Sequence, residues 1–310
     1  MSSKRKVIID TDPGYDDACA IALASLSDKF EILGITTVAG NQTIDNVTKN
    51  ALNLVSFLNM NCPVAKGMSG PLIKELQVGK VHGETGLDNI EFPKTQVNKE
   101  IDKRNAVQFI IDTCKANDKI TLITIGPLTN IAMAIKLNPE IKKHIELISI
   151  MGGSIGLGNV NPAAEYNIYA DPESAEIVFS SGINIKMNGL DVTNLTLPYE
   201  HILKRFENIN TKSSKLFMDC MKNLSIFMDK YYGKKYGSMH DSVAVLTLVD
   251  EDIVKYQKAD VDVDLSHGPS YGRTNCNLYS ETAKNSNIEV AVEINIEKFW
   301  NVIEELYKKY

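Results

Sequence analysis

The most chemically distinctive stretch of the chain is Asp10-Thr11-Asp12-Pro13-Gly14-Tyr15-Asp16-Asp17, which holds four carboxylates within eight residues. It directly follows the apolar run Val7-Ile8-Ile9, which is typical of a buried strand. Carboxylates within about 4–6 Å of one another disfavour joint ionisation, so such a cluster either raises its own pKa values or binds a cation. A hard divalent metal ion, which prefers oxygen ligands, fits best.

Part of this cluster has a simpler explanation. Asp is common at helix starts, and Asp16 and Asp17 precede the apolar helical segment 18–26, where negative charge is favoured by the helix N-terminus. That explanation leaves out Asp10 and Asp12, which stand at the end of the predicted buried strand. We therefore assign the cluster a metal-binding or catalytic role, with Asp10 supporting the loop.

Strand-like and helix-like segments alternate along the chain. The predicted strands are 7–10, 31–38, 63–66, 120–125, 145–151, 184–187, 261–265 and 290–294. The predicted helices are 18–26, 44–58, 103–116, 127–137, 172–181 (capped by Asp171), 218–232 and one following His240-Asp241. This alternation predicts one α/β domain over residues 1–310, with an open, mainly parallel, Rossmann-like sheet flanked by helices.

In sheets of this kind ligands bind beyond the carboxyl ends of the strands. Asp12 follows the first predicted strand, Asn41 the second, Ile125 the fourth and Gly152-Gly153 the fifth. We expect these residues to converge on one rim. The irregular stretch 67–100 contains His82, and a loop of that length inside a compact domain is usually functional.

Composition narrows the function. The formal net charge of -6 and the pI near 5.5, without a dense basic stripe, argue against nucleic acid or an anionic membrane as the main partner. The five cysteines form no C-x-x-C pair, so we expect buried thiols rather than disulfides or a zinc site. The N-terminus has no apolar signal core and no long apolar run follows, so we expect a cytoplasmic protein.

Eight motifs, in order along essentially the whole chain, resemble those of the nucleoside hydrolases, enzymes that split a ribonucleoside into ribose and a free base. They are residues 10–18, Ala39-Gly40-Asn41-Gln42-Thr43, His82-Gly83-Glu84-Thr85-Gly86, Gly126-Pro127-Leu128-Thr129-Asn130, Met151-Gly152-Gly153, Glu165-Tyr166-Asn167, His240-Asp241 and Tyr271-Gly272-Arg273-Thr274. The resemblance implies the fold of that family, a small-molecule ribonucleoside as substrate, a role in nucleoside salvage, and a homodimer or homotetramer.

The resemblance also implies a calcium site. Its ligands would be Asp12, Asp17, Asp241 and the main-chain carbonyl of Ile125. Carboxylates, a carbonyl, water and a substrate diol supply the six to eight oxygens that Ca²⁺ accepts. Asp12 would in addition act as the general base toward a water whose pKa the metal lowers.

The remaining roles implied by the resemblance concern the substrate. The residues expected to hold the ribose hydroxyls are Asp16, Asn41, Asn159, Glu165 and Asn167. His240, which adjoins Asp241, is the expected proton donor to the departing base, and His82 is expected to assist. The other three histidines are expected to be structural or on the surface: His144, His201 and His267.

The base-binding residues show where this chain departs from known branches. Tyr232 matches a tyrosine of the pyrimidine-preferring members, but those members carry Thr and Gln where this chain has Leu224 and Met228. The purine-specific branch stacks the base between tryptophans, whereas the one tryptophan here, Trp300, is expected in the core. We expect a broad inosine/uridine-type or a pyrimidine preference, and a purine-only enzyme is disfavoured.

Two alternatives come from other functional classes. Asp10-Thr11-Asp12 also resembles the start of haloacid-dehalogenase-type, Mg²⁺-dependent phosphatases, but that interpretation leaves Asp16-Asp17 and His240-Asp241 without a role. A non-catalytic module that binds ribose or calcium is the third possibility. It would require a blocked pocket, because every residue needed for metal binding and proton transfer is present.

Overall fold

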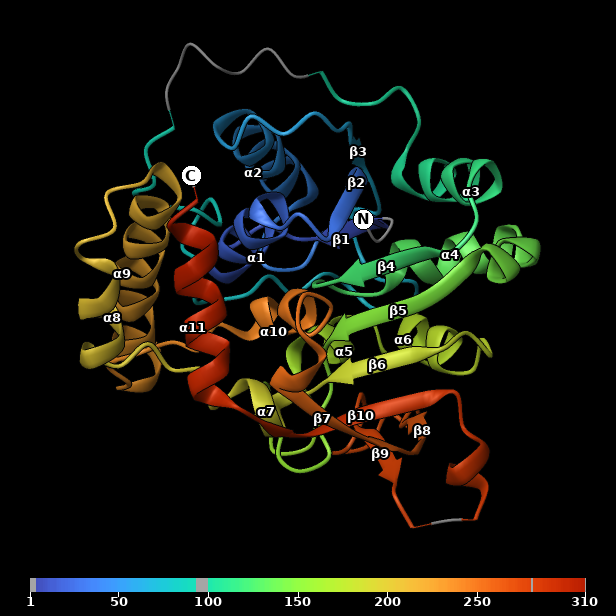
Figure 1. The fold of residues 1–310 in the computed structure, drawn as a ribbon. Helices are drawn as coiled ribbons and strands as arrows, with labels where there is room; N and C mark the ends of the chain where they lie inside the picture. The colour runs from blue at the N-terminus through green and yellow to red at the C-terminus, as the bar shows by residue number, and fades with distance from the viewer. Residues whose placement is uncertain (1–3, 93–99, 280, 310) are drawn as a thin grey trace.

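The computed structural model describes residues 4–92, 100–279 and 281–309, and their strands form one eight-stranded sheet and one two-stranded ribbon (Figure 1). In spatial order the sheet contains β3 (Val64–Lys66), β2 (Phe30–Thr37), β1 (Arg5–Thr11), β4 (Ile120–Thr124), β5 (Ile145–Met151), β6 (Ile185–Asn188), β10 (Ile288–Ile294) and β7 (Val254–Lys258). Neighbouring strands are parallel except β10 and β7. The predicted open, mainly parallel sheet is therefore confirmed.

The strand order creates a crevice beside β1. The chain moves outward from β1 to β2 and β3, then returns to β4 on the other side of β1 and continues to β5 and β6. The connections after β1 and β4 therefore leave in opposite directions at the carboxyl ends of the strands. This switch point is where open α/β sheets bind ligands, and it lies beside the end of β1, where Asp12 stands.

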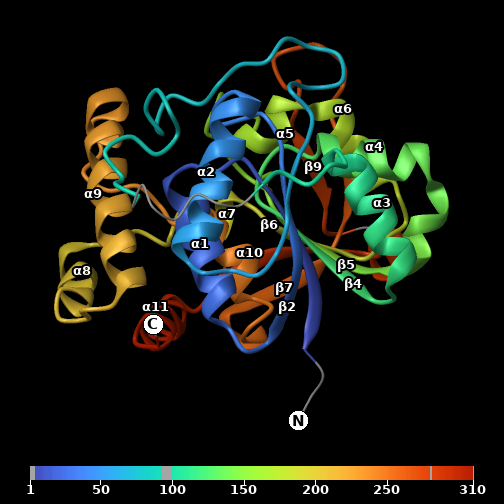
Figure 2. The same ribbon diagram turned by 90° about the horizontal axis from the view of Figure 1, so that it is seen from above.

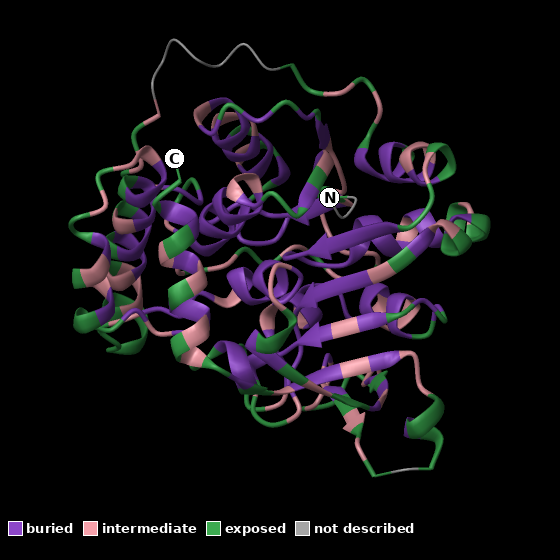
Figure 3. Ribbon diagram, in the orientation of Figure 1, coloured by how far each residue is buried: buried purple, intermediate pink, exposed green. Residues whose placement is uncertain are grey.

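Two helical layers cover the sheet (Figure 2). Val7 and Ile9 of β1 pack into one layer, whereas Ile8, which points to the opposite face, packs into the other. The first layer contains α1 (Tyr15–Leu26), α2 (Ile44–Phe57), α7 (Leu190–Thr193), α8 (Glu200–Phe206), α9 (Lys212–Tyr232), α10 (His240–Leu246) and α11 (Ile296–Tyr307). The second contains α3 (Ala106–Ala116), α4 (Thr129–Leu137), α5 (Tyr166–Ala170) and α6 (Pro172–Phe179). Figure 3 shows the strands buried between these layers.

Several element boundaries differ from the predictions. Helix α1 begins three residues earlier than expected, so Asp16 and Asp17 lie in its first turn. Helix α3 begins at Ala106 rather than at residue 103, because the Asn105 side chain accepts a hydrogen bond from Gln108 N and caps the helix there. The predicted strand 261–265 is β8 (Asp260–Val263), which pairs with β9 (Thr274–Asn277) in the separate ribbon.

Other predictions about supporting residues are confirmed. Asp171 caps α6 by accepting a hydrogen bond from Ser174 N at 3.2 Å, and it also accepts one from Thr129 Oγ1 at 2.6 Å. Trp300 is 1% exposed in the core. All five cysteines are free thiols, and Cys276 alone among them is not fully buried. None of the described helices is long and apolar enough to cross a membrane.

Candidate active site

A cavity of about 1080 Å³ opens at the carboxyl ends of the strands. The structure brings ten of the twelve predicted site residues to its wall: Asp16, Asn41, His82, Ile125, Asn159, Glu165, Asn167, Tyr232, His240 and Asp241. The other two, Asp12 and Asp17, are fully buried and contact wall residue Asn41. Residues separated by up to 229 positions therefore meet at one rim, as the strand pattern predicted.

Two carboxylates of the cavity wall and the buried Asp17 form a compact acidic group. One oxygen from each of Asp16, Asp17 and Asp241 lies within 4.8 Å of the others, and all three residues are buried. Asp17 is held by Thr11 Oγ1, which donates to its Oδ1 at 2.6 Å, and by the Gly14 amide, which donates to its Oδ2 at 2.9 Å. These contacts fix the first turn of α1 against the end of β1.

Asp12 lies beside this group, and only one of its two carboxylate oxygens accepts a hydrogen bond. Its Oδ2 accepts a hydrogen bond from the Asn41 amide at 2.6 Å, whereas its buried Oδ1 has no hydrogen-bond partner among the described residues. A Cβ on Gly40 would lie 2.2 Å from Oδ2, and one on Gly126 would lie 2.7 Å from Oδ1. Glycine at both positions lets the loops after β2 and β4 close against the carboxylate.

The electrostatics of these carboxylates favour a bound cation. Burial, followed by the charge of Asp17, raises the pKa of Asp12 well above its usual range and that of Asp16 to about 7. Burial likewise raises the pKa of Asp17 and of Asp241. A divalent cation reverses this effect and keeps such carboxyls ionised. The free Asp12 Oδ1 and the all-oxygen donor set therefore fit a metal ion.

The acidic group differs in one member from the predicted ligand set. It contains Asp17 and Asp241, as expected, and also Asp16, which was expected to face the ribose. Asp12 lies outside the group, and its Oδ2 accepts a hydrogen bond from the Asn41 amide. Ile125, whose carbonyl is the fourth predicted ligand, lines the cavity.

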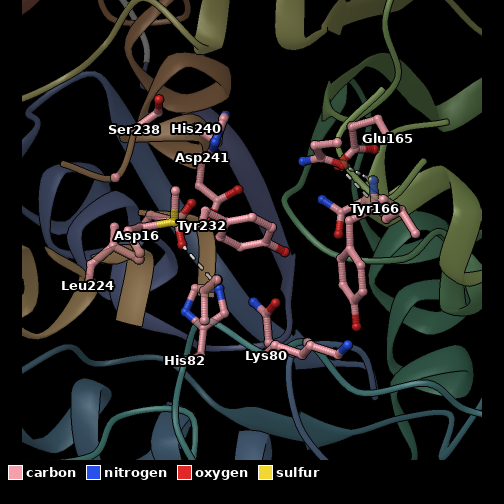
Figure 4. Close-up of a pocket in the computed structure, with 18 of the residues that line it drawn as sticks. Asp16, Lys80, His82, Glu165, Tyr166, Leu224, Tyr232, Ser238, His240 and Asp241 are labelled. Carbon is pink, nitrogen blue, oxygen red and sulfur yellow. Dashed lines mark hydrogen bonds and ion pairs between the residues drawn. The ribbon is translucent and has the colours of Figure 1, made fainter. Parts of the chain in front are cut away.

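The opposite side of the cavity is formed by the loop after β5 and by α5 (Figure 4). Glu165 caps α5: its Oε1 accepts from Asn167 N and its Oε2 from Gly153 N, both at 2.9 Å. Burial raises the pKa of Glu165 to about 7. Asn167 Nδ2 donates to the Met151 carbonyl at 3.1 Å, and Asn159 Oδ1 accepts from the Tyr166 amide at 2.9 Å.

Both predicted histidines face the cavity as neutral rings. His82 Nδ1 accepts a hydrogen bond from the Tyr15 amide at 3.1 Å, so its proton is on Nε2, which lies 3.9 Å from Asp16 Oδ1. Burial lowers the pKa of His82 to about 3 and that of His240 to about 4. Thr193 Oγ1 lies 2.7 Å from His240 Nδ1. With Nδ1 accepting from that hydroxyl, the Nε2–H of His240 is available as a donor.

Helix α9 provides a largely apolar wall. Leu224, Met228 and Tyr232, spaced four residues apart, all line the cavity. Leu224 is 4% exposed and Tyr232 is 52% exposed, so the wall runs from the interior to the mouth. Trp300 is not among the residues that line this cavity.

Among the lining residues to which the sequence analysis assigned no role are Tyr166 and the lysines Lys80, Lys234 and Lys235. The Tyr166 hydroxyl lies 2.7 Å from the Gly40 carbonyl oxygen and 3.0 Å from that of Gln77, which joins α5 to two other loops. Its position between the predicted site residues Glu165 and Asn167 could have indicated that Tyr166 lies at the site. Nothing in the sequence separates these three lysines from other surface lysines.

The fold and the site together define an enzyme that hydrolyses the N-glycosidic bond of ribonucleosides, and comparison with known proteins agrees. Residues 7–301 match the model of the inosine-uridine preferring nucleoside hydrolase family, and the chain belongs to that family. This membership favours the hydrolase over the phosphatase and over the non-catalytic module.

Individual relatives cover the whole chain. The chain is 41% identical over 309 residues to the pyrimidine-specific ribonucleoside hydrolase RihB of Shigella flexneri, with 99% of this chain and 98% of the relative covered. Among solved structures, a plant nucleoside hydrolase, PpNRh1, has a TM-score of 0.91 at 31% identity, with 99% of each chain covered. The purine-preferring ribonucleoside hydrolase from Gardnerella vaginalis has a TM-score of 0.89 at 34% identity, with 98% of this chain and 99% of that chain covered.

Proposed function

We propose that this chain is a Ca²⁺-dependent ribonucleoside hydrolase with a pyrimidine preference that serves nucleoside salvage in the cytoplasm as a homodimer or homotetramer. The observation that carries the proposal is the buried acidic group of Asp16, Asp17 and Asp241, two members of which line the same cavity as two neutral histidines. Carboxylates alone would suit several hydrolases. Their combination with proton donors in a cavity large enough for a nucleoside suits cleavage of a base from ribose.

The metal would be held by the acidic group together with Asp12 Oδ1 and the Ile125 carbonyl. Every donor is an oxygen, and Ca²⁺ tolerates the irregular geometry of six to eight such ligands better than Mg²⁺ does. When bound, the ion would lower the pKa of a coordinated water and orient the ribose hydroxyls. The ion also offsets the mutual repulsion of the buried carboxylates.

The protein residues would divide the proton transfers. Asp12 Oδ1, the free oxygen of a carboxylate whose other oxygen is held by Asn41, would accept the proton of the attacking water. As the bond from the ribose to the base nitrogen breaks, positive charge develops on the ribose and negative charge on the base. The Nε2–H of His240 would donate a hydrogen bond to the departing base and pass it the proton, which the ring would regain from solvent as the products leave, with His82 assisting.

The ribose would lie between the acidic group and the α5 side of the cavity. Asn41, Asn159, Glu165 and Asn167 present amide and carboxyl groups there. Each also makes a hydrogen bond to the protein, so these side chains are oriented before the substrate binds. Such preorganisation lowers the barrier by fixing the sugar in a reactive geometry.

The pyrimidine preference rests on the α9 wall and on one relative. Tyr232 offers a ring to the base, and no tryptophan among the described residues lines the cavity to stack a purine. RihB, which is named as pyrimidine-specific, shares 41% identity over 309 residues. The G. vaginalis enzyme has nearly the same fold and is named as purine-preferring, so side chains rather than the fold must set the preference.

A substrate panel tests this proposal. Uridine, cytidine, inosine, adenosine and guanosine are each assayed for release of free base, before and after chelation with EGTA, and after addition of Ca²⁺ or Mg²⁺. We expect kcat/KM for uridine and cytidine to exceed that for the purines by about tenfold or more. We also expect chelation to abolish activity and Ca²⁺ to restore it.

The panel separates the parts of the proposal. A higher kcat/KM for purines would overturn the base preference but leave the hydrolase intact. Full activity after exhaustive chelation would contradict the metal requirement. Restoration by Mg²⁺ but not by Ca²⁺ would replace the proposed ion.

A further inference from the structure

The turn that carries His82 is bound to helix α2 and to the segment just before it by a row of amide side chains. Gln42 donates to the Gly83 carbonyl at 3.0 Å, Asn46 to that of Glu84 at 3.2 Å, and Asn50 to that of Thr85 at 2.8 Å. The donors are spaced four residues apart and the acceptors are consecutive. Residues 83–85, which form neither helix nor strand, are therefore fixed to a regular element at three successive points.

Asn50 is the member of this row that also reaches the acidic loop. The same Nδ2 that donates to Thr85 donates to the Pro13 carbonyl at 3.0 Å, and Asn50 is 6% exposed. A Cβ on Gly86 would lie 2.7 Å from Asn50 Nδ2 and 2.9 Å from the Pro13 oxygen. Three segments of the chain thus meet at a single amide group with no room for another side chain.

The acidic loop and His82 also contact each other directly. The Tyr15 amide donates to His82 Nδ1 at 3.1 Å, and a Cβ on Gly14 would lie 2.3 Å from the same nitrogen. Tyr15 Oη donates to the Asp88 carbonyl at 3.0 Å, on the far side of the turn. The distance between His82 and the carboxylates therefore depends on how firmly residues 13–15 are attached to residues 82–86.

We propose that Asn50, which touches neither the carboxylates nor the cavity, is a positioning residue that sets the place of His82 relative to the acidic group. Its two hydrogen bonds satisfy one carbonyl on each side of the contact between His82 and Tyr15. Removal of the amide leaves both carbonyls without this donor and lets the turn move away from the loop. This inference rests on the proposed role of His82 in transferring a proton to the base.

A double-mutant cycle between Asn50 and His82 tests the inference. Asn50→Leu keeps the size of the side chain and removes both hydrogen bonds. We expect kcat for uridine to fall by about ten- to a hundredfold, a loss typical of a displacement of about 1 Å at an active site, while KM changes by less than about threefold. In a His82→Ala background the same substitution is expected to cost less than about twofold, because the group that it positions is absent.

Asn46→Leu is the matched control, since Asn46 contacts the same turn but does not reach the Pro13 carbonyl. It is expected to lower kcat less than Asn50→Leu does. If Asn50→Leu does not fold, Asn50→Ser, whose hydroxyl can donate only one hydrogen bond, takes its place in the cycle.

The outcomes separate the proposed role of His82 from that of Asn50. Unchanged activity in His82→Ala alone would remove the role of His82 and, with it, the basis of the inference. In the opposite case, His82→Ala lowers activity, and Asn50→Leu lowers it further by the same factor with and without His82. Asn50 would then support the fold rather than position His82, and the inference would be wrong.

Discussion

The two sides of the cavity are built in opposite ways. The acidic floor, in which the buried Asp12 and Asp17 contact wall residue Asn41, is at most 8% exposed, and each of these three side chains makes at least one hydrogen bond inside the protein. The base wall, formed by Leu224, Met228 and Tyr232, is largely apolar and reaches the solvent at Tyr232. The floor is a polar network, whereas the wall is a helix face.

This difference has an energetic consequence. In the floor, replacing one polar group leaves a buried partner unsatisfied, so a single change disturbs several residues at once. On the wall, a change of similar volume disturbs packing locally. RihB and the G. vaginalis enzyme, whose names state opposite base preferences, both resemble this chain over nearly its full length. We infer that reaction chemistry belongs to the floor and base preference to the wall.

The largest expected effect comes from the floor. Asp12→Asn keeps the shape of the side chain but removes a charge beside the acidic group and the proposed general base. We expect kcat to fall by about a thousandfold or more on every nucleoside, with no change in the order of base preference. Steady-state assays on the five nucleosides, with calorimetric titration of Ca²⁺, provide the measurement.

Asp28→Asn is the control for this substitution, because Asp28 is exposed and lies outside the cavity. Thermal unfolding in EGTA checks that Asp12→Asn remains folded. A loss confined to pyrimidines or to purines would break the comparison, since the floor would then contribute to base preference.

The second effect concerns His240, which lines the same cavity. His240→Ala removes the proposed proton donor, and kcat for uridine is expected to fall by about a hundred- to a thousandfold. In an aryl riboside with a 4-nitrophenolate leaving group, the leaving group departs without protonation. The kcat for this substrate should therefore change by only a few fold. The ratio of the two losses measures how much of the role of His240 is proton donation. Equal losses on both substrates would reject His240 as the acid.

The sheet and its rim were predictable because buried parallel strands appear as short apolar runs separated by helical periodicity. The positions of Asp12 and Asn41 follow from that alternation alone. The strand β7 and the ribbon of β8 and β9 were harder to place, because these strands are short and partly polar and their pairing is set by distant segments.

Within the site, the sequence predicted which residues meet but not how their side chains turn. The acidic group contains Asp16 rather than Asp12, and Asp12 instead accepts a hydrogen bond from the Asn41 amide, 29 positions away. The bridging role of Asn50 depends on carbonyls 37 and 35 positions away, at Pro13 and Thr85. Such contacts leave no periodic pattern, because any residue type supplies a carbonyl.

The smallest expected effect, and the sharpest test of the comparison, comes from the wall. Leu224→Thr combined with Met228→Gln introduces at these two positions the polar residues of the pyrimidine-preferring members. One added hydrogen bond to a base is worth about 1 kcal/mol, so we expect the ratio of kcat/KM for uridine over inosine to rise by about three- to tenfold. Activity on the aryl riboside should stay within about twofold, since that substrate lacks the base and depends on the floor.

Ile226→Thr provides the matched control, because Ile226 lies on the same helix, is 53% exposed and does not line the cavity. It changes the same helix by a similar substitution without touching the base, so the uridine-to-inosine ratio should remain unchanged. If the double substitution lowers aryl riboside cleavage as much as it alters selectivity, the α9 wall cannot vary independently of the acidic floor. The division of chemistry and preference between the two sides would then be wrong.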